Sequence, residues 1–302
     1  MTKRSQARGQ SVFNKTWSMA IWAVSALVVM GVAGGLVFGF FGVKLRPFVP
    51  QNIVFVTNTL DHNEGQILFL HISPAKPNLT LINFDANLTV DVLGGFGEYP
   101  LRSVYPLLKS DQRPPIFIRS AMGQAMGLIV DEVWVIDEIP QLESPDQVKF
   151  FLSEVAIGKG SGRVGLSNRA WLGWLGSNTQ VSDINILGAS QSEDVEKAKA
   201  FFDYPSSTTR CAIAVINTTS IPGLGRKLST IMEQSDLWVV RIDDADQDFP
   251  NSKVVLRPDA DCLQTSKSVS HLLPSEESIQ EDQGLSQEYR ADVVVFLGED
   301  LE

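Results

Sequence analysis

The stretch CAIAVINTTSIPGLGRKLSTIMEQSDLWVVRIDDA, residues 211–245, defines the fold of the C-terminal part of the chain. Its apolar run at 212–216 is typical of a strand. Pro222 then opens a segment through Gln234 whose apolar residues recur at helical spacing. A second apolar run at 237–242 predicts another strand. The residues therefore indicate a strand–helix–strand unit.

The sequence that follows extends this unit to a complete small domain. Residues 253–256 and 292–297 (DVVVFL) predict two more strands, and 261–273 predict a helix between them. The order βαββαβ fits the split-βαβ plait, so we predict a two-layer α+β domain over residues 208–302 that folds on its own. Its acidic segment 275–289 has only Ile279 and Leu285 as apolar anchors and is expected to be mobile.

The two cysteines of the chain both belong to this domain. In the predicted plait, Cys211 precedes the first strand and Cys262 follows the third, which is expected to run parallel to the first. A strand of about six residues is ~20 Å long, whereas the Cα atoms of a disulfide lie within ~7 Å. We therefore predict two free thiols. Two cysteines and three scattered histidines also exclude a zinc site built on these residue types.

Both ends of the domain resemble one known family. The segment 211–245 and the closing ADVVVFLGED at 291–300 resemble the C-terminal domain of LytR-type envelope proteins. That domain has a strand ending in Val-x-Asn, a Gly-x-Gly or Gly-x-Ala helix opening, and a terminal Ala-Asp-Val-Val-Val-x-Leu-Gly. The resemblance implies a cell-envelope protein of bacterial type.

Upstream of the linker DYPSSTTR at 203–210, the chain predicts a second, α/β domain over residues 50–203. Apolar runs and helical periodicity alternate along it. The predicted strands are 53–57, 66–72, 79–84 and 132–136, and the predicted helices are 118–126, 145–157, 167–175 and 190–202.

Three segments of this region resemble the LytR-CpsA-Psr family. They are NFDANLTV at 83–90, GEYPLRSVY at 97–105 and AMGLIVDEVWVI at 125–136. Members of that family transfer glycopolymers from a polyprenyl-phosphate lipid to the cell wall with the help of Mg²⁺. The resemblance therefore implies an α/β domain of this family at residues 50–203.

Several groups that the family uses for chemistry are replaced. Ala86 stands where the family has the arginine that grips pyrophosphate, and Asn87 stands at its neighbouring acid. Gln66 lies near the expected metal-binding aspartate, and Arg102 replaces an asparagine. Phosphoryl transfer needs fixed cations and a metal to stabilise the developing charge. We therefore predict a degenerate, non-catalytic domain, and assign no catalytic, cofactor-binding or metal-binding residues.

A divergent glycopolymer transferase stays open as the alternative. It would use the phosphate-binding candidates Arg102, Arg113 and Arg119 with Mg²⁺ as the cofactor. Asp61, Glu64 and Asp85 are the acids near enough in sequence to hold a metal, although exposed acids in a solvated loop are the expected interpretation.

The N-terminal part of the chain predicts a single membrane anchor. Residues 16–43 contain no ionisable side chain, and about 20 residues suffice to cross a bilayer. The first 46 residues hold six of the 25 basic residues and none of the 35 acidic ones. The remaining 256 residues thus carry 19 basic and 35 acidic side chains, a net charge of −16. The positive-inside rule places residues 1–15 in the cytoplasm and the acidic body outside the cell membrane.

These features set the expected partners. The lipid bilayer is the first, and a cell-wall polymer or an envelope protein is the ligand expected for the body. Gly31, Gly35 and Gly39 form a helix face that permits pairing with a second copy, a homodimer. The acidic body disfavours nucleic acid. Trp171 and Trp174 are expected to pack in the core, with stacking on a sugar or contact with the membrane surface as alternatives.

Overall fold

The computed structural model describes residues 52–57, 66–73, 78–159, 164–202, 210–245, 249–274 and 279–302. These all belong to a unit that runs from Pro50 to Glu302. The predicted membrane span 16–43, with its Gly31, Gly35 and Gly39 face, lies outside them. Among the residues that the model describes, no helix is both long enough and apolar enough to cross a bilayer.

The first sheet is built from residues 52–189 and has the strand order β6-β1-β2-β3-β7. Its central strands β1, β2 and β3 pair antiparallel, while β6 runs parallel to β1 and β7 runs parallel to β3. The strands are β1 (Asn52–Thr57), β2 (Ile67–Ile72), β3 (Leu79–Phe84), β6 (Glu132–Ile136) and β7 (Ile184–Ala189).

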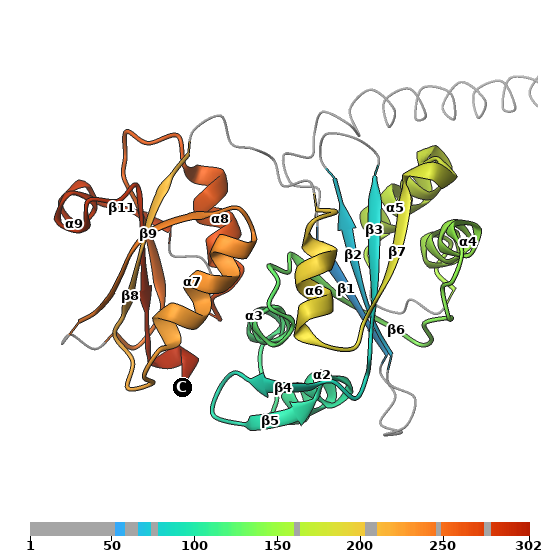
Figure 1. Ribbon diagram of the computed structural model, residues 1–302, viewed down its shortest axis with the longest axis horizontal. Helices are drawn as coiled ribbons and strands as arrows, with labels where there is room; N and C mark the ends of the chain where they lie inside the picture. Colours follow the sequence, from blue (N-terminus) through green and yellow to red (C-terminus); the bar gives the residue numbers. More distant parts are fainter. Residues whose placement is uncertain are drawn as a thin grey trace, which may run out of the picture. The chain divides into compact units, whose positions relative to one another are not determined.

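Helices cover both faces of this sheet, so it forms the middle of three layers (Figure 1). One face packs against α4 (Pro145–Ala156) and α5 (Leu166–Asn178), and the other against α3 (Pro115–Met126) and α6 (Ser192–Lys199). Every residue of β1 and β2 is buried as a result. This explains why these strands are continuous apolar runs rather than alternating ones.

Local sequence signals set the ends of the helices. Ser144 and Gln147 form a capping box at the start of α4. Gly127, with φ of 66°, ends α3 in the left-handed conformation that glycine adopts without strain. The helix predicted over 167–175 begins one residue earlier, at Leu166 after Gly165, and ends later, at Asn178.

A hairpin and a helix between β3 and α3 were missing from the sequence prediction. The hairpin pairs β4 (Thr89–Val92) with β5 (Gly97–Pro100), and α2 (Leu101–Ser110) follows directly. Each strand has only four residues, and β5 is not buried, so neither shows a strong apolar run. The turn uses Gly94 and Gly95, which both have positive φ.

The second sheet, built from residues 212–297, has the strand order β11-β10-β12-β8-β9. Helices α7 (Leu224–Gln234) and α8 (Leu263–Ser270) pack on one face, and α9 (Gln283–Tyr289) packs on the other. The strands are β8 (Ala212–Asn217), β9 (Trp238–Asp244), β10 (Lys253–Leu256), β11 (Ile279–Glu281) and β12 (Val293–Leu297), and the turn η2 (Glu299–Leu301) follows the last of them.

All six predicted elements of this region are present, but the predicted plait is wrong. β9 lies directly beside β8 and parallel to it, and β12 is inserted between β8 and β10. The segment expected to be mobile contributes β11 and α9 within residues 279–289. Asp282 stabilises α9 because its side chain accepts hydrogen bonds from the Gly284 and Leu285 amides.

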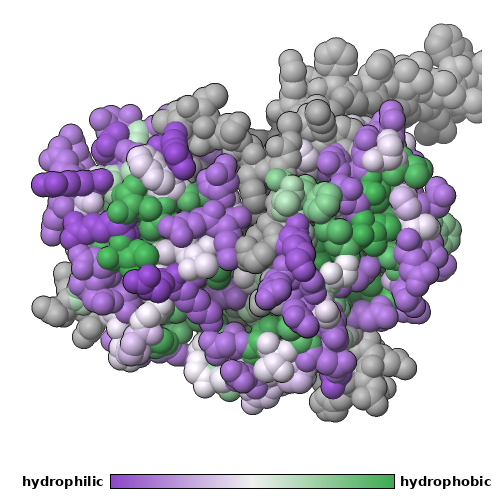
Figure 2. Space-filling view, viewed as in Figure 1, coloured by the Kyte–Doolittle hydropathy of each residue, from purple (hydrophilic) through white to green (hydrophobic). Residues whose placement is uncertain are grey.

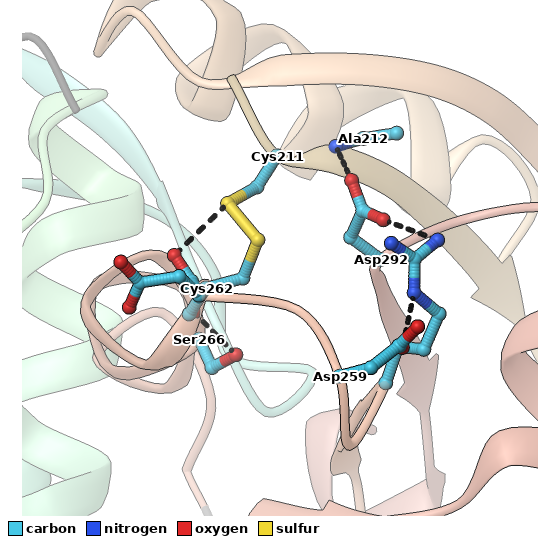
Figure 3. Close-up of a disulfide and its surroundings, with 8 residues drawn as sticks. Cys211, Ala212, Asp259, Cys262, Ser266 and Asp292 are labelled. Carbon is cyan, nitrogen blue, oxygen red and sulfur yellow. Dashed lines mark hydrogen bonds and ion pairs between the residues drawn. A yellow bond between two sulfur atoms is a disulfide. The ribbon is translucent and has the colours of Figure 1, made fainter. Parts of the chain in front are cut away.

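The strand directions also overturn the prediction of two free thiols. Cys211 and Cys262 form a disulfide, with Cα atoms 5.9 Å apart (Figure 3). β12 runs parallel to β8 and antiparallel to β10, so β10 runs opposite to β8. The end of β10 therefore returns to the start of β8, and the ~20 Å separation expected from parallel strands does not exist.

Polar contacts beside the disulfide hold the same strand ends together (Figure 3). The Asp292 carboxylate accepts a hydrogen bond from the Ala212 amide at 2.8 Å and pairs with the Arg257 guanidinium at 2.7 Å. Arg257 also pairs with Asp259. These contacts join the start of β8, the end of β10 and the start of β12.

Candidate functional site

The turn after β3 contains Ala86 and Asn87, the positions at which the sequence resemblance predicts a lost arginine and a lost acid. Asp85 begins it, and the Asp85 amide donates to the Ala189 carbonyl at the end of β7. Its carboxylate accepts a hydrogen bond from the Asn87 amide at 2.8 Å, and its carbonyl accepts one from the Leu88 amide. Asp85 therefore closes its own turn, which is the usual role of aspartate in this setting.

Arg102 is the candidate that the fold brings to this turn. It lies in the first turn of α2, and its amide donates to the Ala86 carbonyl at 3.0 Å. Its guanidinium donates to the side-chain oxygen of Asn87. Arg102 thus brings one cation to this turn, where the side-chain amide of Asn87 holds it.

The other two candidate arginines lie on neighbouring elements. Arg113 precedes α3, where its guanidinium pairs with Asp111 at 2.6 Å and stacks over Phe96 and Phe117 at 5.5 and 4.7 Å. This arginine is therefore committed to packing. Arg119 lies half-buried within α3.

Asp85 is the only one of the three candidate metal-binding acids that the structure describes. Among the described residues, no group of three or more His, Cys, Asp or Glu side chains is close enough to hold a metal. The carboxylate of Asp85 is engaged by the Asn87 amide. Asp61 and Glu64 lie outside the described residues. We derive no step through a metal.

The two tryptophans of α5 differ in environment. Trp171 is partly buried and packs against the core between the sheet and α4, as expected. Trp174 is 50% exposed, so core packing does not account for it.

The second sheet has a shallow depression that the sequence did not reveal. It measures about 430 Å³ and is lined by Val240, Arg241, Glu288, Tyr289 and Arg290. Arg241 stacks over the Tyr289 ring at 5.2 Å and pairs with Asp243 at 2.5 Å. Burial, with the nearby Glu288, raises the pKa of Tyr289. These residues come from β9 and α9, and α9 is an element that the sequence pattern missed.

The fold thus defines a mixed α/β protein with a three-layer body and a second, disulfide-linked sheet. Residues 210–301 match the family described as LytR cell envelope-related transcriptional attenuator. This match confirms the LytR C-terminal domain predicted from the two sequence ends. It covers the second sheet and leaves the family of the first sheet a prediction.

Solved structures add only weak similarity. A transcriptional regulator from Enterococcus faecalis has 11% identity and a TM-score of 0.25, covering 80% of this chain and 92% of its own. TagT from B. subtilis has 10% identity and a TM-score of 0.24, covering 76% and 95%. TagT bound to LIIa-WTA has 8% identity, with the same TM-score and coverage. Scores this low carry no argument. A search of the curated proteins finds no match.

Proposed function

We propose that the chain is a membrane-anchored, extracytoplasmic cell-envelope protein that acts as a non-catalytic binding or scaffold module related to wall-glycopolymer attachment. The observation that supports a non-catalytic role is the composition and bonding of the turn at Asp85–Leu88. A transferase must neutralise a pyrophosphate in its transition state. Here Ala86 has no charge to offer, and the guanidinium of Arg102 is bonded to Asn87.

The Cys211–Cys262 disulfide supports a place outside the cytoplasm. Disulfides persist in oxidising compartments and are rare where cytosolic reductants act. The positive-inside rule gives the same orientation from an independent feature, the basic residues before the predicted span.

The LytR-type domain is the part that we propose presents a binding surface to a wall polymer or an envelope protein. The net charge of −16 on residues 47–302 argues against nucleic acid as a ligand. Pairing of two spans through Gly31, Gly35 and Gly39 would present two such domains side by side.

One observation favours the alternative, a divergent transferase. The Nε atom of Arg102 is buried, and no described residue accepts a hydrogen bond from it. A substrate phosphate would satisfy such a donor.

The location is tested by labelling single introduced cysteines in intact cells. The native cysteines are bonded to each other, so only an introduced thiol reacts. Ser275→Cys is expected to react with an impermeant thiol reagent, and Ser5→Cys to be protected until the cells are lysed. The reverse pattern would overturn the orientation.

The non-catalytic assignment is tested by equilibrium binding of inorganic pyrophosphate with Mg²⁺ to the full chain in detergent. The wild type and Arg102→Ala are expected to give the same negligible signal. Saturable binding by the wild type that Arg102→Ala abolishes would favour the transferase.

A further inference from the structure

Helix α5 carries an exposed tryptophan, Trp174, that core packing does not account for. Both ends of α5 lie at one end of the first sheet. At its start, the Asn168 amide side chain donates to Glu132, the first residue of β6, at 3.0 Å. At its finish, the chain passes through the short turn η1 (Val181–Asp183) into Ile184, the first residue of β7.

This is also the end of the sheet where the chain enters from its N-terminal side. Glu132 pairs with Ile53, next to Asn52, which begins β1. On the other side of the sheet, Ile184 of β7 pairs with Leu79 of β3, which pairs with Ile72 of β2. The neighbour of Ile72 in β2, His71, pairs with Asn52 at the start of β1. The helix α5 therefore lies at the same end as the start of β1.

Apolar side chains are exposed around this helix. Trp174 is 50% exposed, Ile157 at the end of α4 is 79% exposed, and Val181 in η1 is 48% exposed. The end of α4 adjoins the start of α5, since a side chain at Gly158 would collide with Arg169. Figure 2 shows hydrophobic surface over the part of the molecule where α5 and β7 lie.

The charge of this segment is opposite to that of the body. Residues 154–183 contain Lys159, Arg163 and Arg169 against Glu154 and Asp183, a net charge of +1, whereas residues 47–302 carry a net charge of −16. Lys159 pairs with Glu154 at 2.5 Å, and α5 itself contains no acidic residue. Aromatic and basic side chains together are typical of surfaces that rest on anionic lipid headgroups.

The length of the connecting chain keeps this end close to a bilayer. Eight residues, 44–51, separate the predicted span from β1. Fully extended, they reach at most ~30 Å. The structure thus brings an exposed, acid-free, tryptophan-bearing helix to the end of the sheet that the predicted anchor tethers.

We propose that α5, with Trp174 and the neighbouring Ile157 and Val181, rests on the anionic lipid surface beside the anchor and fixes the orientation of the body. This inference rests on the proposed membrane anchoring. The occupant is a lipid surface because the cations are complementary to anionic headgroups and the tether limits the distance.

The experiment places a spin label on the full chain, reconstituted in vesicles that contain phosphatidylglycerol. Ser177→Cys is exposed and lies one turn after Trp174 in α5, and Gln287→Cys on α9 is the exposed control. The disulfide leaves the introduced cysteine as the only thiol. Collision rates with oxygen and with a water-soluble nickel chelate report lipid and water contact.

We expect the oxygen-to-nickel ratio at position 177 to be severalfold higher than at position 287. Trp174→Ser in the Ser177→Cys background is expected to remove the difference without unfolding, because Trp174 is half exposed. Equal ratios at the two positions would overturn the inference. Loss of nickel contact at 177 without a gain in oxygen contact would also overturn it, because that result indicates a protein partner.

Flotation of the same vesicles separates this inference from the anchoring on which it rests. Protein that does not float with the vesicles contradicts the membrane anchor itself. Protein that floats but keeps its 177 label in water contradicts only the contact of α5 with lipid.

Discussion

The two sheets differ in what their sequences have kept. The second sheet retains the recognisable features of the LytR C-terminal domain, and residues 210–301 match that family. Its strand ends are joined by a disulfide and by the Asp292 contacts. The first sheet has a buried framework of strands, and the side chains of its turn at Asp85–Leu88 bond within the turn and to Arg102.

The largest effect is expected from removing the disulfide. Cys211→Ser with Cys262→Ser frees a loop of 51 residues. In the chain-entropy model this costs about 4 kcal/mol of unfolding free energy. Urea denaturation of the full chain in detergent, followed by tryptophan fluorescence, measures it. Reductant should lower the midpoint of the wild type to that of the variant, and an unchanged midpoint would show that the bond does not stabilise the fold.

The next largest loss of stability is expected from removing hydrogen bonds between α3 of the first region and the segment after α8 of the second. Ser120 and Gln124 of α3 both donate to the Leu272 carbonyl just after α8, at 2.7 and 2.9 Å. Ser120→Ala with Gln124→Ala leaves a buried carbonyl without these donors, at a cost of about 1–3 kcal/mol. Two separate unfolding transitions in the variant would indicate that these contacts couple the regions. Ser110→Ala, which removes only a local exposed bond, is the control and should shift stability by at most about 0.5 kcal/mol.

A smaller effect concerns Asp300 in the second sheet. Burial raises the pKa of its carboxyl, partly offset by hydrogen bonds from Ser252. Because the folded pKa lies above the unfolded one, stability falls as pH rises from the ordinary aspartate value through the raised value. Asp300→Asn removes this dependence. The variant should be the more stable protein at pH 7, and its advantage should disappear at low pH in parallel urea titrations. A constant difference across that range would contradict this.

The smallest change in stability is expected at the turn of the first sheet. Ala86→Arg adds a cation at a half-buried position of the turn, where Ala86 itself takes part in hydrogen bonding through its backbone carbonyl. The unfolding free energy should move by no more than about 0.5 kcal/mol. A large loss of stability would show that the packing of this turn does not tolerate a long side chain at position 86.

The strands and helices were largely predictable because they follow local apolar patterns. The prediction for β8 is correct to within one residue, since 212–216 is an uninterrupted apolar run. The hairpin β4–β5 was missed because its strands are short and half exposed. The order of β8, β10 and β12 is a non-local property, and the pairing of Cys211 with Cys262 depends on it. The sequence therefore predicted most of the elements and missed the disulfide.

The candidate site was predictable only as a set of substitutions. Ala86 and Asn87 are visible in the sequence, but the bond between Arg102 and Asn87 joins residues fifteen positions apart through the hairpin that was missed. The contacts of Arg113 with two phenylalanine rings likewise need the turn of the missed hairpin, which carries Phe96, to lie near Phe117 of α3. The sequence shows which residue types stand at positions 86 and 87, whereas the fold shows what Arg102 and Arg113 contact.

The most direct test of the central claim is turnover of a polyprenyl-pyrophosphate-linked glycan by the full chain in vesicles with Mg²⁺. We expect no product above the background without protein. Ala86→Arg with Asn87→Asp should not raise turnover appreciably, because the metal-binding acid near Gln66 is still missing. Robust turnover by the wild type, abolished by Arg102→Ala in a protein with unchanged stability, would contradict the non-catalytic assignment and establish a divergent transferase.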